Sequence, residues 1–424
     1  MAPEPDLDPD DVPRTLLVTV TGPDRPGVTA LVCSALAAHE VDVVDVEQVV
    51  IRGRLTLGIL VAPAASLQHG AVLELEAAGR TAVAALEGTG MDAEVTLGAA
   101  EHDVRRRGRL LVTVLGHPLA PAALSGLASS ISAEGGNIER IVRTAAYPVT
   151  AIELTVGGAD LRALRDALTA ESSSLGVDVA VQPAGMRGRG TYLVVMDVDS
   201  TLIQDEVIEL IARRAGREDE VRGITERAMC GELDFAGSLH ERVALLAGVP
   251  VSALDEVRQD VRLTPGARTL VRTLTRLGFR VAVVSGGFAE VVRPLAAELG
   301  IHHVRANSLE VADGRLTGRV LGPVVDRAGK AAALREIAAL DGIPLERTIA
   351  IGDGANDLDM LSTAGLGVAF NAKPVVRAQA HTGITVPFLD PVLYLLGITR
   401  EEVEAADAAA GTPTPAPPVP PGRG

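Results

Sequence analysis

The chain has 424 residues, which is too long for one ordinary hydrophobic core and predicts roughly two to four domains. Its composition is 47% hydrophobic, as in a globular α/β protein, and its formal net charge of −16 argues against a nucleic-acid or anionic-membrane partner. Aromatic residues make up only 2% of the chain and Trp is absent, so surfaces that stack on nucleic-acid bases are not expected.

Membrane and secretion signals are not evident in the sequence. No stretch reaches the roughly 18 apolar residues of a membrane-spanning helix. Residues 1–13 are acidic and Pro-rich, so they predict a disordered tail and not a signal peptide. Cys33 and Cys230 lie in unrelated contexts and indicate neither a disulfide framework nor a zinc site. We therefore expect a cytoplasmic protein.

Residues 14–98 predict the order strand, helix, strand, strand, helix, strand. A strand at 16–20 leads into a glycine-containing loop, in which Asp24 is the expected N-cap of a helix over about 28–39. Two strands joined by a hairpin turn, a second helix and a final strand follow. Their expected ranges are 41–50, 55–61, about 71–86 and about 93–97.

Residues 109–183 repeat this pattern. Positions 110–114 match positions 16–20 residue for residue, Gly116 takes the place of Gly22, and the same order of strands and helices follows. Repetition this specific predicts a duplicated module. The two copies resemble ACT domains, which are βαββαβ ferredoxin-like regulatory modules that often bind amino acids where two copies meet.

The ACT resemblance implies an amino-acid effector site at Asp24 and Gly27, and it favours a homodimer. The loop before the first helix offers free N–H groups and the positive end of the helix dipole to a carboxylate. The second copy has no Asp-Arg-Pro-Gly sequence at the matching place, which puts a second effector site in doubt. A purely structural or dimerising role for both copies is the alternative.

Residues 184–190 predict a linker to a second half at 191–398, in which strand ends carry polar residues. Asp197 and Asp199 follow an apolar, β-prone run that is typical of a strand buried on both faces. Ser285 follows another strand, and Asp353 and Asp357 follow a third. Alternating strands and helices predict a parallel sheet, whose carboxyl ends form the ligand crevice.

Clustered carboxylates at that crevice predict a bound cation. Without one, some of the acids would have raised pKa values because like charges repel. Oxygen-only ligands suit Mg²⁺, which typically binds one or two protein carboxylates together with substrate phosphate. Phosphate would also explain Ser285 and Lys330, a hydroxyl and a cation able to hold its oxygens. Residues about 204–264 show only helical patterns and predict a cap over the crevice.

Two other phosphate-binding motifs are rejected. The Gly352-containing turn has Asp357 where a dinucleotide-binding loop has its third glycine, and Asp353 would face a pyrophosphate. A Walker loop at Lys330 is excluded by Val324 at the first glycine position and by Ala331 where Ser or Thr is needed. The last segment, 399–424, predicts a disordered Pro-rich tail.

The four motifs together, in this order, resemble the haloacid dehalogenase (HAD) superfamily of phosphotransferases. Asp197 and Asp199 match its first motif, Ser285 its second, Lys330 its third and residues 352–357 its fourth. Within the superfamily, the positions after the first motif and in the cap are most similar to those of phosphoserine phosphatases, some of which carry preceding ACT modules. The implied fold is a Rossmann-like parallel sheet with a helical cap.

The resemblance also implies a mechanism. Asp197 would be the nucleophile, Asp199 the acid and base, and Ser285 and Lys330 would bind the phosphoryl group. Mg²⁺ would be held by Asp197, Asp353 and the backbone carbonyl of Asp199. The implied substrate-binding residues are Glu206, Met229, Phe235, Arg242, Ser285, Gly286, Lys330 and Asn356.

The implied reaction is Mg²⁺-dependent hydrolysis of O-phosphoserine in serine biosynthesis, through an aspartyl-phosphate and under amino-acid regulation. Two alternatives stay open from the sequence. One is a phosphatase or phosphotransferase for another small phosphate ester. The other is an amino-acid sensor with a vestigial catalytic half. Phosphate release that depends on Mg²⁺ would separate the enzymes from the sensor.

Overall fold

The computed structural model describes residues 14–65, 67, 70–99, 109–184, 191–229, 234–412 and 414. The chain forms two compact units, residues 1–107 and 108–424. Among the described residues, no helix combines the length and the apolar character needed to cross a membrane.

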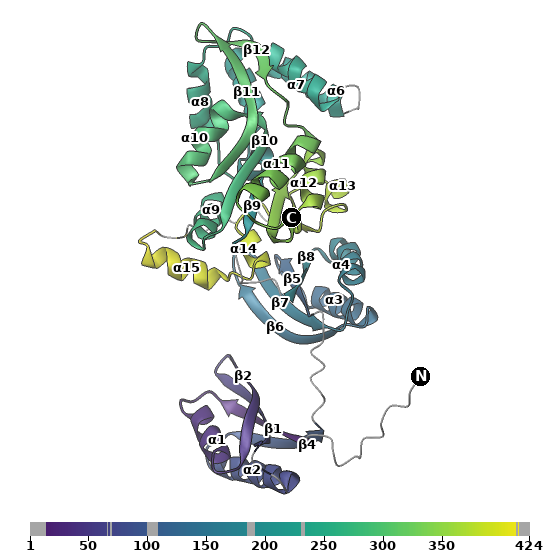
Figure 1. The fold of residues 1–424 in the computed structure, drawn as a ribbon, viewed down its shortest axis with the longest axis vertical. Helices are drawn as coiled ribbons and strands as arrows, with labels where there is room; N and C mark the ends of the chain where they lie inside the picture. Colours follow the sequence, from purple (N-terminus) through teal and green to yellow (C-terminus); the bar gives the residue numbers. More distant parts are fainter. Residues whose placement is uncertain are drawn as a thin grey trace. The chain divides into compact units, whose positions relative to one another are not determined.

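The first unit is a four-stranded antiparallel sheet in the order β2-β3-β1-β4, with two helices packed on one face (Figure 1). Alternating residues of β1 and β3, such as Val18 and Leu57, meet both helices in one core. The predicted order of elements is confirmed. The bounds are β1 Arg14–Pro23, α1 Val28–Leu36, β2 Val41–Ile51, β3 Arg54–Pro63, α2 Ala71–Leu86 and β4 Asp92–Ala99.

The start of α1 differs from the prediction. Gly27 is its N-cap, with a φ of 93°, and no side chain caps the helix. Asp24 lies upstream, where its backbone N–H donates to the carbonyl of Gly53 at 2.8 Å. The positive φ explains the difference, because only glycine adopts it at little cost, whereas a capping Asp would need an extended backbone directly before the helix.

The second unit begins with the repeated module. Its sheet has the matching order β6-β7-β5-β8, with the two helices packed against each other and the sheet. The βαββαβ order predicted for this copy is confirmed as well. The bounds are β5 Leu110–Gly116, α3 Pro121–Ala133, β6 Asn137–Ala145, β7 Thr150–Gly157, α4 Leu161–Leu175 and β8 Asp178–Pro183.

The rest of the second unit is built on a seven-stranded sheet in the order β12-β11-β10-β9-β13-β14-β15. Strand β9 is central and pairs in parallel with β10 and β13, which confirms the predicted parallel sheet. The strand bounds are β9 Leu193–Met196, β10 Arg280–Phe288, β11 His303–Ala312, β12 Arg315–Leu321, β13 Thr348–Gly352, β14 Leu366–Phe370 and β15 Thr382–Ile384.

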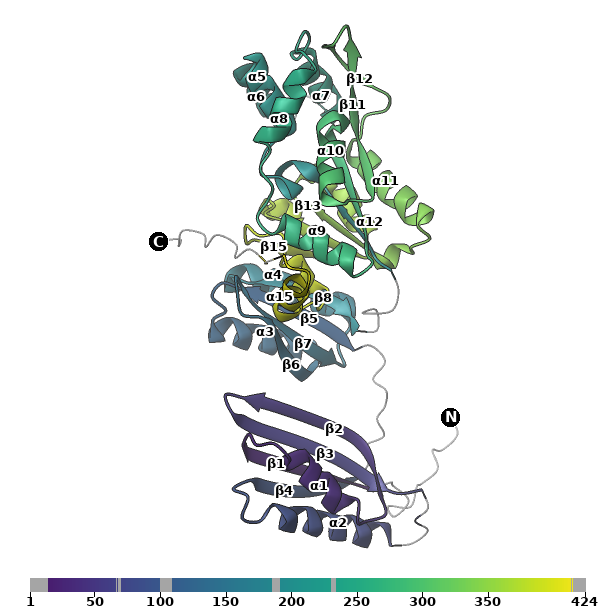
Figure 2. The same ribbon diagram turned by 90° about the vertical axis from the view of Figure 1, so that its left-hand side faces the viewer.

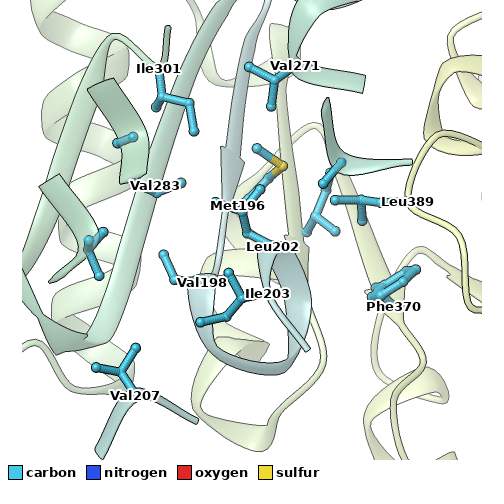
Figure 3. Packing of buried hydrophobic residues seen from close by; sticks show 14 of the residues in the cluster. Met196, Val198, Leu202, Ile203, Val207, Val271, Val283, Ile301, Phe370 and Leu389 are labelled. Atoms are coloured by element: carbon cyan, nitrogen blue, oxygen red, sulfur yellow. The ribbon is translucent and has the colours of Figure 1, made fainter. Parts of the chain in front are cut away.

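Strand β9 is apolar throughout because both of its faces are buried. Leu193 and Val195 pack on one face with α11 (Arg327–Leu340) and α12 (Leu358–Thr363). Met196 and Val194 pack on the other face, where Figure 3 shows Met196 beside Val198 and Leu202. Helices α9 (Ala267–Arg276) and α10 (Ala289–Leu299) cover this second face.

A helical segment lies between β9 and α9, and the β11–β12 hairpin reaches it (Figure 2). The N–H of Gly248 donates to the carbonyl of Leu316, and the N–H of Leu316 donates to the carbonyl of Val249, both at 2.8 Å. The hairpin is thus a second wall of the cap. The cap helices are α5 Val207–Ala215, α6 Glu218–Met229, α7 Phe235–Ala244 and α8 Ser252–Asp260.

The C-terminal segment is a correction to the prediction of a disordered tail from residue 399. Helix α15 (Arg400–Ala409) begins with a capping box, in which Thr399 and Glu402 exchange side chain and backbone hydrogen bonds. Its buried Asp407 accepts hydrogen bonds from Arg272 and Arg276 of α9. These long-range ion pairs, together with the packing of Val403 in the core, dock an Ala-rich helix that composition alone does not distinguish from the tail. Two short helices, α13 Pro374–Arg377 and α14 Val392–Leu395, precede it.

Candidate active site

Three strand ends meet at one edge of the sheet. Asp197 directly follows β9, Ser285 lies near the end of β10, and Asp353 follows β13. Because β10 and β13 flank β9 in parallel, these side chains come together at the carboxyl edge. Oxygens of Asp197, Asp353 and Asp357 all lie within 4.8 Å of one another. The structure therefore unites acids that are about 160 positions apart in the chain.

Lys330 lies between two of these carboxylates. Its Nζ donates to Asp197 Oδ2 at 2.6 Å and to Asp357 Oδ1 at 2.7 Å, and its side chain is fully buried. Asp326 caps α11 through the N–H of Gly329, which places Lys330 in the first turn. Burial lowers the pKa of Lys330, but the two carboxylates outweigh it and the net shift is upward. The ammonium therefore stays charged.

The loop after β13 is tightly folded around Asp357. The N–H of Gly354 donates to Asp357 Oδ2 at 3.0 Å, and a Cβ at Gly352 would lie 2.4 Å from Asp357 Cγ. Asp353 accepts a hydrogen bond from Thr201 Oγ1 at 2.8 Å. Burial raises the pKa of Asp353 to about 6. The close approach of the Asp357 carboxylate thus requires glycine at position 352.

The first two acids have different surroundings. Burial and the neighbouring Asp357 raise the pKa of Asp197, while the Lys330 ammonium acts against them. Burial and then Glu206 raise the pKa of Asp199 to about 7. Asp199 accepts hydrogen bonds from the Val207 N–H at 3.0 Å and from the Ser285 hydroxyl at 3.4 Å. A carboxyl with a pKa near neutrality suits a group that must both donate and accept a proton.

The turn that follows Asp197 and contains Asp199 has an unusual backbone. Residues Val198–Leu202 form a wide turn whose backbone is not helical at Asp199, with a ψ of 133°, or at Ser200, with a φ of 57°. The Ser200 hydroxyl donates to Glu206 Oε1 at 2.9 Å. Burial raises the pKa of Glu206, a shift opposed by the Ser200 hydrogen bond and by the charge of Arg242. The turn thus connects the acids at the sheet edge to charged groups of the cap.

The cap contributes further predicted substrate-binding residues. A Cβ at Gly286 would lie 2.9 Å from Phe235 Cζ, so the phenyl ring covers the loop after Ser285. Arg242 is half-buried, and its Nε donates to the Ser238 carbonyl at 3.3 Å. Burial lowers the pKa of Arg242, whereas Glu206 and Asp199 raise it, which places its charge near both acids.

The other residues predicted to bind substrate or effector are Asn356, Met229, Asp24 and Gly27. Asn356 is on the loop after β13, close enough to Gly354 that a Cβ there would meet Asn356 Oδ1 at 2.1 Å. The Met229 side chain lies outside the described part of the chain. Asp24 and Gly27 are exposed on the loop before α1, in the other compact unit. Their effector role stays a prediction.

One buried polar residue of the site was missed from the sequence. Asn307 in β11 donates from Nδ2 to the Gly286 carbonyl at 2.7 Å and accepts from the Val325 N–H at 2.8 Å. It thereby joins the loop after Ser285 to the segment before α11. Its only sequence signal is an amide in an otherwise regular strand, and such a residue is usually exposed.

The chain matches three family models in the expected order. Residues 194–362 match the haloacid dehalogenase-like hydrolases, and residues 14–80 and 110–182 each match an ACT domain model. These matches confirm the predicted superfamily and the duplicated module.

Two relatives that match this chain over nearly their whole length are both phosphoserine phosphatases. A phosphoserine phosphatase of Streptomyces coelicolor is 59% identical over 94% of this chain and 96% of its own length. Phosphoserine phosphatase SerB2 of Mycobacterium tuberculosis is 50% identical over 93% and 96%. The solved structure of a probable phosphoserine phosphatase from Vibrio cholerae covers 72% of this chain and 90% of its own, with 34% identity and a TM-score of 0.55.

Proposed function

The chain belongs to the phosphoserine phosphatase family of haloacid dehalogenase-like hydrolases, and we propose on this basis that it hydrolyses O-phosphoserine to serine and phosphate. Such a phosphoric monoester hydrolase would catalyse the last step of serine biosynthesis. The observation that carries the proposal is the position of Lys330 between Asp197 and Asp357, with Asp199 and Ser285 beside them.

In the first half of the proposed reaction, Asp197 is the nucleophile. A carboxylate oxygen of Asp197 attacks phosphorus, the bond from phosphorus to the serine oxygen breaks, and Asp199 protonates that oxygen. The raised pKa of Asp199, about 7, supports a protonated form at the start of the step. Lys330 and the Ser285 hydroxyl hold the phosphoryl oxygens as negative charge develops on them.

In the second half, water attacks the aspartyl-phosphate. Asp199, now ionised, takes a proton from the water, the bond from phosphorus to Asp197 breaks, and phosphate leaves. This exchange returns both acids to their starting states. Asp357 accepts a hydrogen bond from Lys330 Nζ at 2.7 Å, which directs the ammonium at the nucleophile.

The acidic cluster fits a divalent cation. Among the described residues, Lys330 is the only cation hydrogen-bonded to Asp197 and Asp357, so three clustered carboxylates share one positive charge, and burial raises the pKa of Asp353. We assign Mg²⁺ to Asp197, Asp353 and the backbone carbonyl of Asp199, since hard cations prefer oxygen ligands. When bound, Mg²⁺ supplies positive charge to the phosphoryl oxygens.

Substrate selection is assigned to the cap. Glu206 suits the ammonium group of phosphoserine, and Arg242 suits its carboxylate as a bidentate partner. Phe235 and Met229 would exclude water above Gly286. Asn356, on the edge of the crevice, would contact the substrate or a water. Because the opposed charges of Glu206 and Arg242 match a zwitterion, we favour phosphoserine over other small phosphate esters.

Phosphate release across a panel of small phosphoesters, with and without Mg²⁺, tests this function. We expect O-phosphoserine to be the preferred substrate and release to require Mg²⁺. Asp197→Asn should abolish turnover and keep the fold, whereas Asp255→Asn, at an exposed position of α8, should keep both. Normal hydrolysis by the Asp197 variant would contradict the nucleophile assignment. No hydrolysis of any ester would favour the amino-acid sensor.

We further propose that an amino acid binds the loop at Asp24 and Gly27 and that the protein works as a cytoplasmic homodimer. The ACT family matches and the exposed glycine turn at the start of α1 support the effector role. Calorimetry of residues 1–183 with serine and other amino acids tests it, and no heat with any of them would count against it. Sedimentation of the full chain tests the dimer.

A further inference from the structure

The chain leaves the sheet edge for the cap and returns from it along two segments that pair with each other. Ile203 on the outgoing segment and Leu263 on the returning one form an antiparallel bridge. The N–H of Thr264 donates to the Leu202 carbonyl at 3.0 Å. Leu202 and Ile203 themselves pack in the apolar core (Figure 3). The returning segment is therefore held by its backbone against the turn that contains Asp199.

The Thr264 side chain makes a further hydrogen bond to this turn. Its hydroxyl donates to the Thr201 carbonyl at 2.6 Å, and both residues are buried. The Thr201 hydroxyl donates in turn to Asp353 Oδ1 at 2.8 Å, since a hydroxyl has one hydrogen and an ionised carboxylate only accepts. Two hydrogen bonds thus connect the segment that returns from the cap to an acid assigned to Mg²⁺.

The position of Thr201 depends on such outside contacts because the residues before it lack helical geometry. Asp199 has a ψ of 133° and Ser200 a φ of 57°. A regular ladder of backbone hydrogen bonds therefore does not fix the turn there. A shift of the Thr201 backbone would carry its hydroxyl away from Asp353 and free the carboxylate to rotate.

A buried carbonyl needs a donor in any fold, so the Thr264 bond by itself says nothing about function. Its significance comes from the residue that accepts it, because the hydroxyl of that same residue holds Asp353. Thr273, on the adjoining helix α9, offers a contrast. It is also buried, but its hydroxyl has no hydrogen-bond partner in the part of the chain that the structure describes.

On the basis of the Mg²⁺ assignment in the proposed function, we propose that Thr264 is a positioning residue of the metal site. Its hydroxyl fixes Thr201, and Thr201 fixes the carboxylate of Asp353 for the cation. Loss of a group that orients a metal ligand typically weakens metal binding about 10–100-fold. Thr264 acts through one intermediate residue, so we expect an effect at the lower end of this range.

Metal binding by the full chain without substrate tests this role. Mn²⁺ takes the same oxygen ligands as Mg²⁺, and electron paramagnetic resonance measures its unbound fraction. Titration with Mn²⁺ and its displacement by Mg²⁺ give both dissociation constants. Thr264→Val removes the hydroxyl and keeps the backbone bond to Leu202, so both metals should bind about tenfold more weakly. Thr264→Ser keeps a hydroxyl and should bind both metals as the wild type does.

Control variants separate this role from a general loss of structure. Thr273→Val removes a buried hydroxyl that has no partner among the described residues, so both dissociation constants should stay unchanged. Thr201→Val should weaken binding at least as much as Thr264→Val. In that background Thr264→Val should add little, because the bond to Asp353 is already lost. Circular dichroism confirms folding before each titration, and Thr264→Ala serves as a second variant without the hydroxyl.

Each contrary outcome has its own meaning. Equal metal binding by the wild type and by the Val and Ala variants of Thr264 would overturn the positioning role and leave the metal assignment standing. A loss that Thr264→Ser shares would assign the effect to packing, and an undiminished loss in the Thr201→Val background would exclude the path through Thr201. No binding of either metal by the wild type would refute the metal assignment and, with it, the role of Thr264.

Discussion

Replacing Lys330 by Met tests the electrostatic design of the site most directly. Lys330 and Lys373 are the only lysines of the chain. Lys330 is fully buried and pairs with two buried carboxylates, at 2.6 and 2.7 Å. Methionine has a similar length and no charge, so the substitution leaves Asp197 and Asp357 facing each other without their shared cation.

The expected cost follows from these contacts. Removing one partner of a buried ion pair costs about 3–5 kcal/mol, because an uncompensated charge stays buried. Here one of the two acids should take up a proton instead, since like charges and burial both raise its pKa. A carboxyl whose folded pKa lies above its unfolded pKa contributes stability at low pH and loses it as pH rises. We therefore expect a smaller deficit at pH 5 than at pH 8.

Urea unfolding of the metal-free protein at both pH values measures this deficit. Lys373→Met is the matched control, and its exposed position predicts a change within about 0.5 kcal/mol. Adding Asp357→Asn to Lys330→Met should restore part of the stability at pH 8 by removing one of the two acids. A loss below about 1 kcal/mol that does not vary with pH would refute the reasoning.

Three further predictions concern other buried polar groups. Burial raises the pKa of Asp178 to about 6, so the contribution of this carboxyl to stability is lost as pH rises through 6. The free energy of unfolding of Asp178→Asn should therefore exceed that of the wild type by up to about 3 kcal/mol at pH 8 and should equal it near pH 4. A difference in urea titrations that does not change with pH would contradict this. Asn307→Ala should cost about 1–3 kcal/mol and reduce phosphate release, because it frees the Gly286 loop; unchanged unfolding and turnover would remove its positioning role. Arg242→Lys should raise KM for O-phosphoserine more than it lowers kcat, and an equal fall of kcat and kcat/KM would contradict a ground-state contact.

Local patterns in the sequence were sufficient to predict the order of strands and helices and the parallel sheet. The apolar run of β9 predicts a strand buried on both faces, because polar residues there would lose hydration on either side. The repeated order of strands and helices predicts two copies of one module, since each copy has its own apolar faces to bury. Acids at the ends of such strands predict a common crevice, because parallel strands end at the same edge.

Contacts between distant segments were decided only by the tertiary structure. The pairing of Lys330 with Asp357, the bridge made by Asn307 and the hydrogen bond from Thr382 to the Val179 carbonyl each join different elements. Sequence periodicity reports which face of an element is buried, but not what that face meets. Helix α15 shows both sides of this limit: its Thr399/Glu402 capping box is a local signal, whereas its ion pairs with α9 are visible only in the tertiary structure.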